Sequence, residues 1–210
     1  MIAPPERSPE RDAALAALLP RVPAQGFTLA ALRAALADIG EDPRDAELLF
    51  PGGTMEMVEA VLDRADRAME AAAGDLAALR TGARVRALLA LRLAQAGPHK
   101  EAVRRAVGLL ALPRNLRLAA RCTARTVDAI WFLAGDTAAD FSWYTKRATL
   151  AAVYSATLLY WLRDAGEDDA ATLAFLDRRL AGVARVGRLR ARAGNALACA
   201  TPAGSAAATS

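Results

Sequence analysis

Apolar residues at helical spacing run through almost the whole chain, in segments separated by glycine and proline. Between residues 29 and 39 they recur every three or four positions, which is the period of a helix with one buried face. No segment shows the strict alternation of a half-buried strand. Alanine, leucine and arginine, which have a low free-energy cost in a helix, dominate the composition. The sequence therefore predicts an all-α protein. The breaks fall at Gly40, residues 51–53, Gly82, residues 97–98, Pro113, Gly135 and Gly166.

Three short predicted helices precede a set of longer ones. The short ones are expected near residues 9–19, 28–40 and 42–50, and the longer ones at 54–80, 83–96, 98–112, 115–134, 140–164 and 169–192. Proline in one end segment, and a composition of Ala, Ser, Thr, Gly and Pro in the other, predict disordered tails over 1–8 and 193–210. We expect an N-terminal module over 9–53, followed by a ligand-binding and dimerisation bundle over 54–192.

The N-terminal module contains the stretch GFTLAALRAALADIGEDPRDAELLFPGG. Phe-Thr opens its second helix, Gly40 sits in the turn, and Phe-Pro-Gly follows the third helix. This stretch resembles the helix-turn-helix of TetR-type regulators. The resemblance implies a TetR-like fold, in which a short three-helix module precedes a larger C-terminal helical bundle.

The third helix of this module has few side chains suited to contact DNA. A recognition helix needs basic or amide side chains aimed at base edges and phosphates. Residues 41–47 instead hold four acids and one arginine, and residues 28–59 hold two arginines against seven acids. Phosphate would be repelled by this charge. We therefore expect no nucleic-acid partner, although a ligand-responsive repressor of the TetR type is the alternative function.

Residues suited to catalysis are scarce. His99 is the only histidine, and no Glu-x-x-His pair, GxSxG, P-loop or GxGxxG motif occurs. The two cysteines, Cys122 and Cys199, are far apart in the sequence and have no CxxC partner. We expect neither an enzyme nor a metal or nucleotide cofactor.

The most informative stretch covers residues 111–164 and continues over 172–183. It contains Pro-x-Asn, Val-Asp-x-Ile-Trp, Gly-Asp-Thr, Ser-Trp-Tyr-Thr-Lys-Arg, Val-Tyr and Phe-Leu-Asp-Arg-Arg. This series closely resembles the accessory proteins of coenzyme Q biosynthesis, the Coq-nine family. The resemblance implies a TetR-like homodimer without DNA binding. It also implies that the protein holds an isoprenoid or quinone lipid at the membrane and presents it to the di-iron hydroxylase of coenzyme Q synthesis.

The helix expected around residues 148–162 is apolar on nearly every side. Such a helix is either enclosed by a core or faces an apolar cavity on one side. Core burial is the simpler interpretation for any single residue, and a purely structural subunit without ligand is a third possible function. The lipid-binding residues predicted for the cavity are Leu89, Leu93, Leu109, Trp131, Tyr154 and Leu158.

Two adjacent aromatic residues open the same predicted helix. Trp143 and Tyr144 point about 100° apart, so both cannot be deeply buried on one face. Aromatic side chains and arginine dominate binding hot spots, so we predict a surface for the hydroxylase partner. Alternatively, Trp143 packs under the neighbouring loop. The predicted partner-binding residues are Asp140, Trp143, Tyr144, Lys146 and Arg147.

The last predicted helix has an apolar and a basic side. A basic amphipathic helix can lie in a membrane interface, although an ordinary bundle helix with an arginine face has the same pattern. The predicted membrane-binding residues are Phe175, Leu176, Leu180 and Val183, with Arg178, Arg185 and Arg188. The longest nearly uncharged run, residues 148–162, is shorter than the ~18–20 residues that span a bilayer. We expect a cytoplasmic protein that docks peripherally on the inner face of an anionic membrane.

Overall fold

The computed structural model describes residues 3–136, 142–166 and 168–200, excluding the side chains of Ser142 and of residues 186–200. The described residues form helices and no strand, so the predicted all-α class is confirmed. The short N-terminal helices are α1 (Pro9–Leu18), α2 (Val22–Gln25), α3 (Leu29–Asp38) and α4 (Asp45–Leu49). The longer ones are α5 (Gly53–Ala72), α6 (Thr81–Ala96), α7 (Lys100–Leu110), α8 (Leu116–Leu133), α9 (Ser142–Arg163) and α10 (Ala170–Ala200). Single 3-10 turns precede α2, α7 and α8.

Local sequence signals set the N-terminal module. The Thr28 hydroxyl accepts a hydrogen bond from the Ala31 amide at 3.1 Å, which caps the first turn of α3. Gly40 ends that helix with a φ of +79°, a conformation that glycine adopts without steric cost. The apolar faces of α1 and α3 meet at Leu15, Leu32 and other fully buried side chains. The core of the module is shared with the bundle, since Met57 and Val58 of α5 and Ala102 and Ala106 of α7 belong to it.

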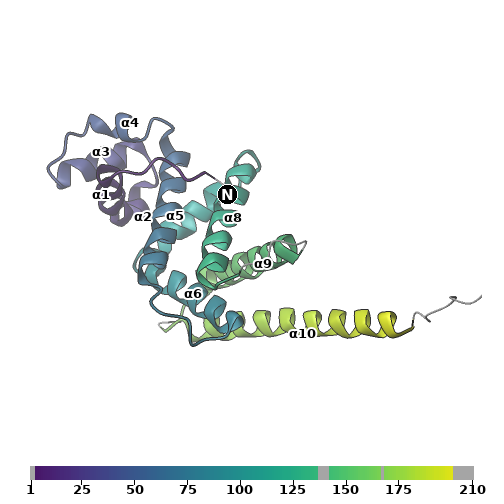
Figure 1. Cartoon of the computed structure of the whole chain (residues 1–210). Coiled ribbons are helices and arrows are strands. Elements are labelled where there is room, and N and C mark those ends of the chain that lie inside the picture. Colours follow the sequence, from purple (N-terminus) through teal and green to yellow (C-terminus); the bar gives the residue numbers. More distant parts are fainter. Residues whose placement is uncertain (1–2, 137–141, 167, 201–210) are drawn as a thin grey trace, which may run out of the picture.

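The bundle is organised around α5, which runs from the N-terminal module into the larger part of the molecule (Figure 1). Its C-terminal half packs against α6 and α8, and α9 lies against α8 on the other side. A second core joins these helices and α10 through Met69, Leu88, Ile130, Leu150 and Leu176. The bundle therefore has a packed apolar interior that holds its helices in place beside the cavity described below.

Two helix ends differ from the sequence expectation. The helix α5 ends at Ala72 rather than near residue 80, because Gly74 adopts a φ of +60° and turns the chain towards α6. The last helix continues to Ala200, beyond residue 192. The segment before residue 9 is also in contact with the fold: the Arg7 guanidinium pairs with the Asp63 carboxylate at 2.7 Å.

The first turns of α10 belong to the bundle, and the rest of the helix projects away from it (Figure 1). Leu176 is fully buried against the bundle core and Leu180 packs beside it, whereas Val183 is 40% exposed. No helix in the described part of the chain is both long and apolar enough to cross a bilayer.

Candidate ligand-binding cavity

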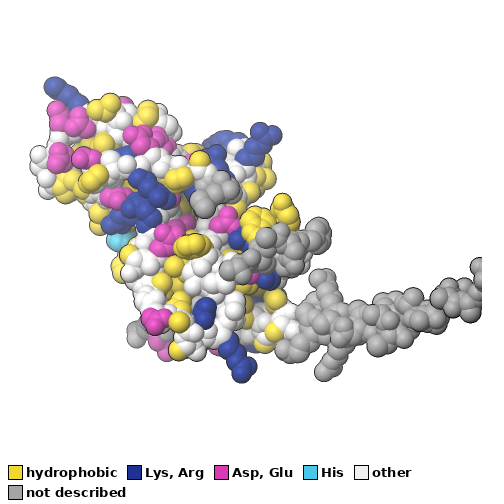
Figure 2. Space-filling model, in the orientation of Figure 1, with side chains coloured by type: hydrophobic (Ala, Val, Ile, Leu, Met, Phe, Trp, Pro, Cys, Tyr) yellow, Lys and Arg dark blue, Asp and Glu magenta, His cyan; other side chains and the backbone are white. Residues whose placement is uncertain are grey.

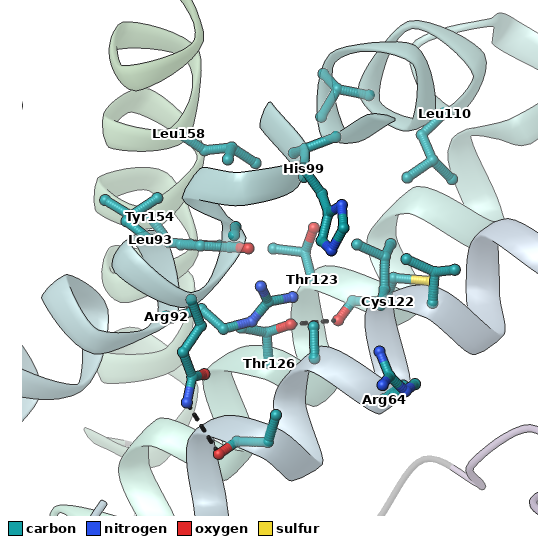
Figure 3. Close-up of a pocket in the computed structure, with 18 of the residues that line it drawn as sticks. Arg64, Arg92, Leu93, His99, Leu110, Cys122, Thr123, Thr126, Tyr154 and Leu158 are labelled. Carbon is teal, nitrogen blue, oxygen red and sulfur yellow. Dashed lines mark hydrogen bonds between the residues drawn. The ribbon is translucent and has the colours of Figure 1, made fainter. Parts of the chain in front are cut away.

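A cavity of about 720 Å³ lies among α5, α6, α7, α8 and α9 (Figure 3). Sites for small ligands commonly occupy about 300–1,000 Å³. Apolar side chains from all five helices form most of its wall. They include Leu62, Leu93, Val103, Val107, Leu110, Leu116, Ala119 and Leu158. The space is therefore large enough and apolar enough for the chain of a lipid.

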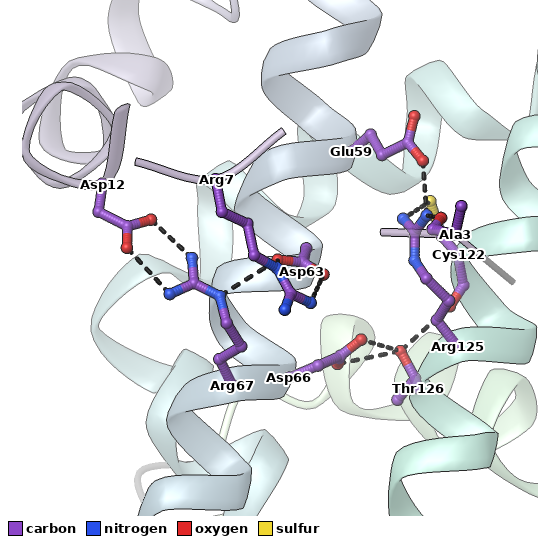
Figure 4. Close-up of polar contacts among 10 residues, drawn as sticks. All are labelled: Ala3, Arg7, Asp12, Glu59, Asp63, Asp66, Arg67, Cys122, Arg125 and Thr126. Atoms are coloured by element: carbon purple, nitrogen blue, oxygen red, sulfur yellow. Dashed lines mark hydrogen bonds and ion pairs between the residues drawn. The ribbon is translucent and has the colours of Figure 1, made fainter. Parts of the chain in front are cut away.

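The N-terminal module supplies part of the same wall. Asp12 and Leu19, from α1 and the turn that follows it, line the cavity beside α5. Two ion pairs connect this region to α5: Arg67 of α5 contacts Asp12 at 2.6 Å, and Arg7 contacts Asp63 of α5 at 2.7 Å (Figure 4). Within α5, Arg67 also pairs with Asp63 at 3.2 Å. The cavity thus lies between the two predicted modules, not inside the bundle alone.

A buried polar cluster forms one end of the cavity. The Arg92 Nε donates to Asp66 Oδ1 at 3.0 Å, and the Thr126 hydroxyl donates to the same carboxylate at 2.9 Å. Arg92 and Asp66 are only 4% and 6% exposed. Burial raises the pKa of the Asp66 carboxyl, against the opposite effects of Arg92 and Thr126. The cluster adds a buried ion pair to a cavity whose wall is mainly apolar.

Cys122 lines the cavity next to this cluster. Burial raises the pKa of its thiol to about 11, so the sulfur stays protonated and unreactive at neutral pH. His99 also lines the cavity. Within the described residues, no group of three or more His, Cys, Asp or Glu side chains is placed to hold a metal ion.

Three of the six predicted lipid-binding residues line the cavity, and the other three lie elsewhere. Leu93, Tyr154 and Leu158 line the cavity. Leu89 lies instead in the packed core of α6, α8 and α9, where it is fully buried. Leu109 faces a shallow depression beside Phe27, and Trp131 packs against the bundle core below the Lys146 ammonium. Helical spacing shows which side of a helix is buried, but not whether that side meets a neighbour or a void.

The predicted partner-binding residues lie together at the start of α9, except that Asp140 falls outside the described residues. Tyr144 is 67% exposed, and Trp143 is half-buried with the Arg147 guanidinium 3.8 Å from its ring centre. Asp136 holds the Lys146 ammonium at 2.7 Å. We call Trp143, Tyr144, Lys146 and Arg147 the aromatic–basic patch.

The predicted membrane-binding residues of α10 differ in burial: some pack against the bundle and others are exposed. Leu176 is in the bundle core, so it cannot enter a membrane. Phe175 stacks on Tyr160 of α9, with ring centres 4.5 Å apart. Arg178, Val183 and Arg185 are exposed, and Leu180 is half-buried. Arg188 lies in the projecting part of the helix, where the side chains fall outside the described residues.

Figure 2 shows several acidic side chains, among apolar and basic ones, on the side of the N-terminal module that faces the viewer. The helix α4 has only five residues, with Asp45 and Glu47 in its first turn. Arg33, which precedes it on α3, is paired with Glu47. The arrangement offers phosphate few free cations.

Comparison with known proteins shows which family this chain resembles. The family model described as COQ9 matches residues 116–187. The chain carries a COQ9 domain. Ubiquinone biosynthesis protein COQ9, mitochondrial, of Homo sapiens is 31% identical over 176 residues, which cover 79% of this chain and 55% of the human protein. The coq9 protein of Schizosaccharomyces pombe is 31% identical over 163 residues, covering 77% of this chain and 65% of the yeast protein. The predicted family resemblance is confirmed.

The chain spans about half the length of the human COQ9 protein. The COQ9 domain covers α8, α9 and the first half of α10, including the aromatic–basic patch. In overall fold the protein is similar to a TetR transcriptional regulator from Nitrosomonas europaea, with a TM-score of 0.68 at 22% identity over 84% of this chain and 99% of that one. The predicted TetR-like fold is therefore confirmed.

Proposed function

We propose that this COQ9-domain protein is an accessory carrier in ubiquinone biosynthesis. In this proposal it holds a prenylated quinone intermediate, or another isoprenoid lipid, in the cavity and presents it to a di-iron hydroxylase. The large cavity is the observation that carries the proposal, since its mainly apolar wall favours a ligand with a long hydrocarbon chain. The names of the relatives support the pathway. The protein acts on its ligand by binding it, without chemistry of its own.

Filling the cavity should remove the lipid without unfolding the protein. Ala119 lines the wall on α8, and the neighbouring Ala120 is exposed on the same helix. Ala119→Trp should therefore occupy the space of the hydrocarbon chain, whereas Ala120→Trp should leave it free. Native mass spectrometry of gently purified protein should show bound lipid in the wild type and Ala120→Trp, and none in Ala119→Trp. A wild type that carries no lipid, or an Ala119→Trp variant that retains it, would contradict the proposal.

The aromatic–basic patch is the proposed contact for the hydroxylase. Exposed tyrosine and half-buried tryptophan beside two basic side chains form the composition of a binding hot spot. Their ion pairs with Asp136 and Asp128 hold the basic groups in place before a partner arrives. A surface ordered in advance loses less entropy on binding.

Tyr144→Lys should weaken binding of the hydroxylase by at least tenfold, because a central aromatic hot spot contributes about 2 kcal/mol or more. Leu48→Lys is the matched control, since Leu48 is also exposed (79%) but lies on α4. Surface plasmon resonance on immobilised hydroxylase would compare the two variants, with thermal melts to verify the fold. Equal losses in both variants, or none in Tyr144→Lys, would exclude this surface.

We also propose that the projecting part of α10 docks on the inner face of an anionic membrane. Residues 183–200 contain Arg185, Arg188, Arg190 and Arg192 without an acid. The bundle does not cover this part of the helix (Figure 1). Each basic residue near an anionic surface contributes about 1 kcal/mol, an attraction that salt screens. The half-buried Leu180 and buried Leu176 keep the base of the helix attached to the bundle.

Replacing Arg185, Arg188 and Arg192 together with glutamate should abolish sedimentation with phosphatidylserine-containing vesicles at low salt. The corresponding triple lysine variant keeps the charge and should still sediment. Lipid in the cavity should be unaffected in both variants, because the cavity walls end before α10. Vesicle binding that survives the charge reversal would place the membrane contact elsewhere.

A homodimer is part of the same proposal. Light scattering coupled to gel filtration would test it with the full chain, and a monomer at micromolar concentration would contradict it.

A further inference from the structure

The Arg92 guanidinium is buried but only partly used by the protein. Its Nε donates to Asp66, and the side chain is 5% exposed. No described residue accepts a hydrogen bond from either terminal Nη atom. Figure 3 shows the guanidinium directed towards the middle of the cavity. These terminal nitrogens can be reached from the cavity, so their four N–H groups are available to a ligand that enters it.

Tyr154 presents a second donor from the opposite helix. Its side chain lies on α9 and the residue is 6% exposed, with the hydroxyl also directed into the cavity (Figure 3). Within the described part of the chain, that hydroxyl has no hydrogen-bond partner. Burial raises the pKa of the phenol, which keeps it protonated and able to donate. Arg92 and Tyr154 together therefore define a polar end to the apolar cavity.

Asp66 limits the charge that this end accepts. Its carboxylate lies 3.0 Å from Arg92 Nε and compensates the positive charge of the guanidinium. An anion bound beside Arg92 would share a guanidinium whose charge Asp66 already compensates, and it would lose its hydration at a large cost. Uncharged acceptor oxygens, such as those of a carbonyl or a phenol, meet the free N–H groups without that cost.

We infer that Arg92 and Tyr154 bind the oxygen-bearing head of the ligand, a neutral ring with carbonyl or phenol oxygens, while its hydrocarbon chain lies along the apolar walls of α7 and α8. This inference rests on the proposed lipid-carrier function and names the part of the cavity that recognises the head. The walls offered to the chain include Val103, Val107, Leu110 and Ala119.

Three probes that each carry one farnesyl chain distinguish recognition of the head from binding of the hydrocarbon tail. They are a farnesyl-substituted benzoquinone, the hydrocarbon farnesene, and farnesoic acid, each tested by displacement of Nile red from the full-length protein. The quinone should bind about tenfold more tightly than the hydrocarbon, and also more tightly than the acid. Tyr154→Phe removes only the hydroxyl. Arg92→Lys keeps the charge beside Asp66 but loses the planar fork of donors.

Both variants should lower the affinity for the quinone by roughly tenfold and leave that for farnesene unchanged. Thermal melts would show that Tyr154→Phe is folded, which keeps the test valid if Arg92→Lys is not. Equal binding of quinone and farnesene by the wild type, a preference for the acid, or an unchanged quinone preference in Tyr154→Phe would overturn the inference and leave the lipid carrier intact. Failure of every probe to displace Nile red would overturn both.

Discussion

Replacing Asp66 with alanine should lower the free energy of unfolding by about 3–5 kcal/mol. The substitution leaves the Arg92 guanidinium buried, with no other described carboxylate in contact with it. It also removes the acceptor of the Thr126 hydroxyl. The loss exceeds that of an exposed ion pair, which contributes about 1 kcal/mol or less, because the orphaned guanidinium is only 5% exposed and is poorly solvated.

Removing both charges together should restore most of this stability. In Asp66→Leu/Arg92→Met, apolar side chains replace the buried pair, so no uncompensated charge is left. Urea denaturation followed by circular dichroism would measure both variants against the wild type. The matched control is Asp177→Ala, whose carboxylate pairs with Arg86 at 2.6 Å but on the surface. Equal destabilisation by Asp66→Ala and Asp177→Ala would show that the buried pair has no special role in stability.

Leu176→Ala should cost about 2–5 kcal/mol, the usual cost of truncating a fully buried leucine. Leu176 is 0% exposed in the core formed by α6, α8, α9 and α10. Val183, seven residues further along the same helix, is 40% exposed, so Val183→Ala should change stability by no more than about 0.5 kcal/mol. Both residues were predicted to belong to one membrane-binding face.

Denaturation of these two variants thus separates the base of α10 from its projecting part. The same proteins can be tested for vesicle binding. Leu176→Ala should bind vesicles as well as the wild type does under conditions in which it remains folded. A small stability loss in Leu176→Ala would mean that Leu176 does not attach the helix to the bundle core.

Local signals predicted the helices well because they act over a few residues. Thr28 caps α3 and Gly40 ends it through backbone geometry that depends on neighbouring residues alone. The end of α5 was missed because a single Gly74 is a weak signal within a run of helix-forming alanines. That position became clear only from the direction the chain takes towards α6.

The cavity was harder to predict because a core and a void demand the same residue types. Leu89 and Leu93 are one helical turn apart on α6, yet Leu89 lies in packed core and Leu93 lines the cavity. The sequence did not predict Asp66 and Arg92 as residues of the site, since charged residues on a helix are usually solvated. Their pairing depends on how α5 meets α6, which helical periodicity does not encode.

The contribution of α1 to the cavity has a practical consequence for how the protein can be divided. A fragment limited to the COQ9 domain would keep two of the five principal walls and expose the remainder of the chamber to water. Even a truncation that begins at α5 would lose Asp12 and Leu19, and with Asp12 one of the two carboxylates that pair with Arg67. The N-terminal module, whose third helix is poorly suited to bind DNA, therefore has a structural role. It supplies the wall of the cavity on the side of α1.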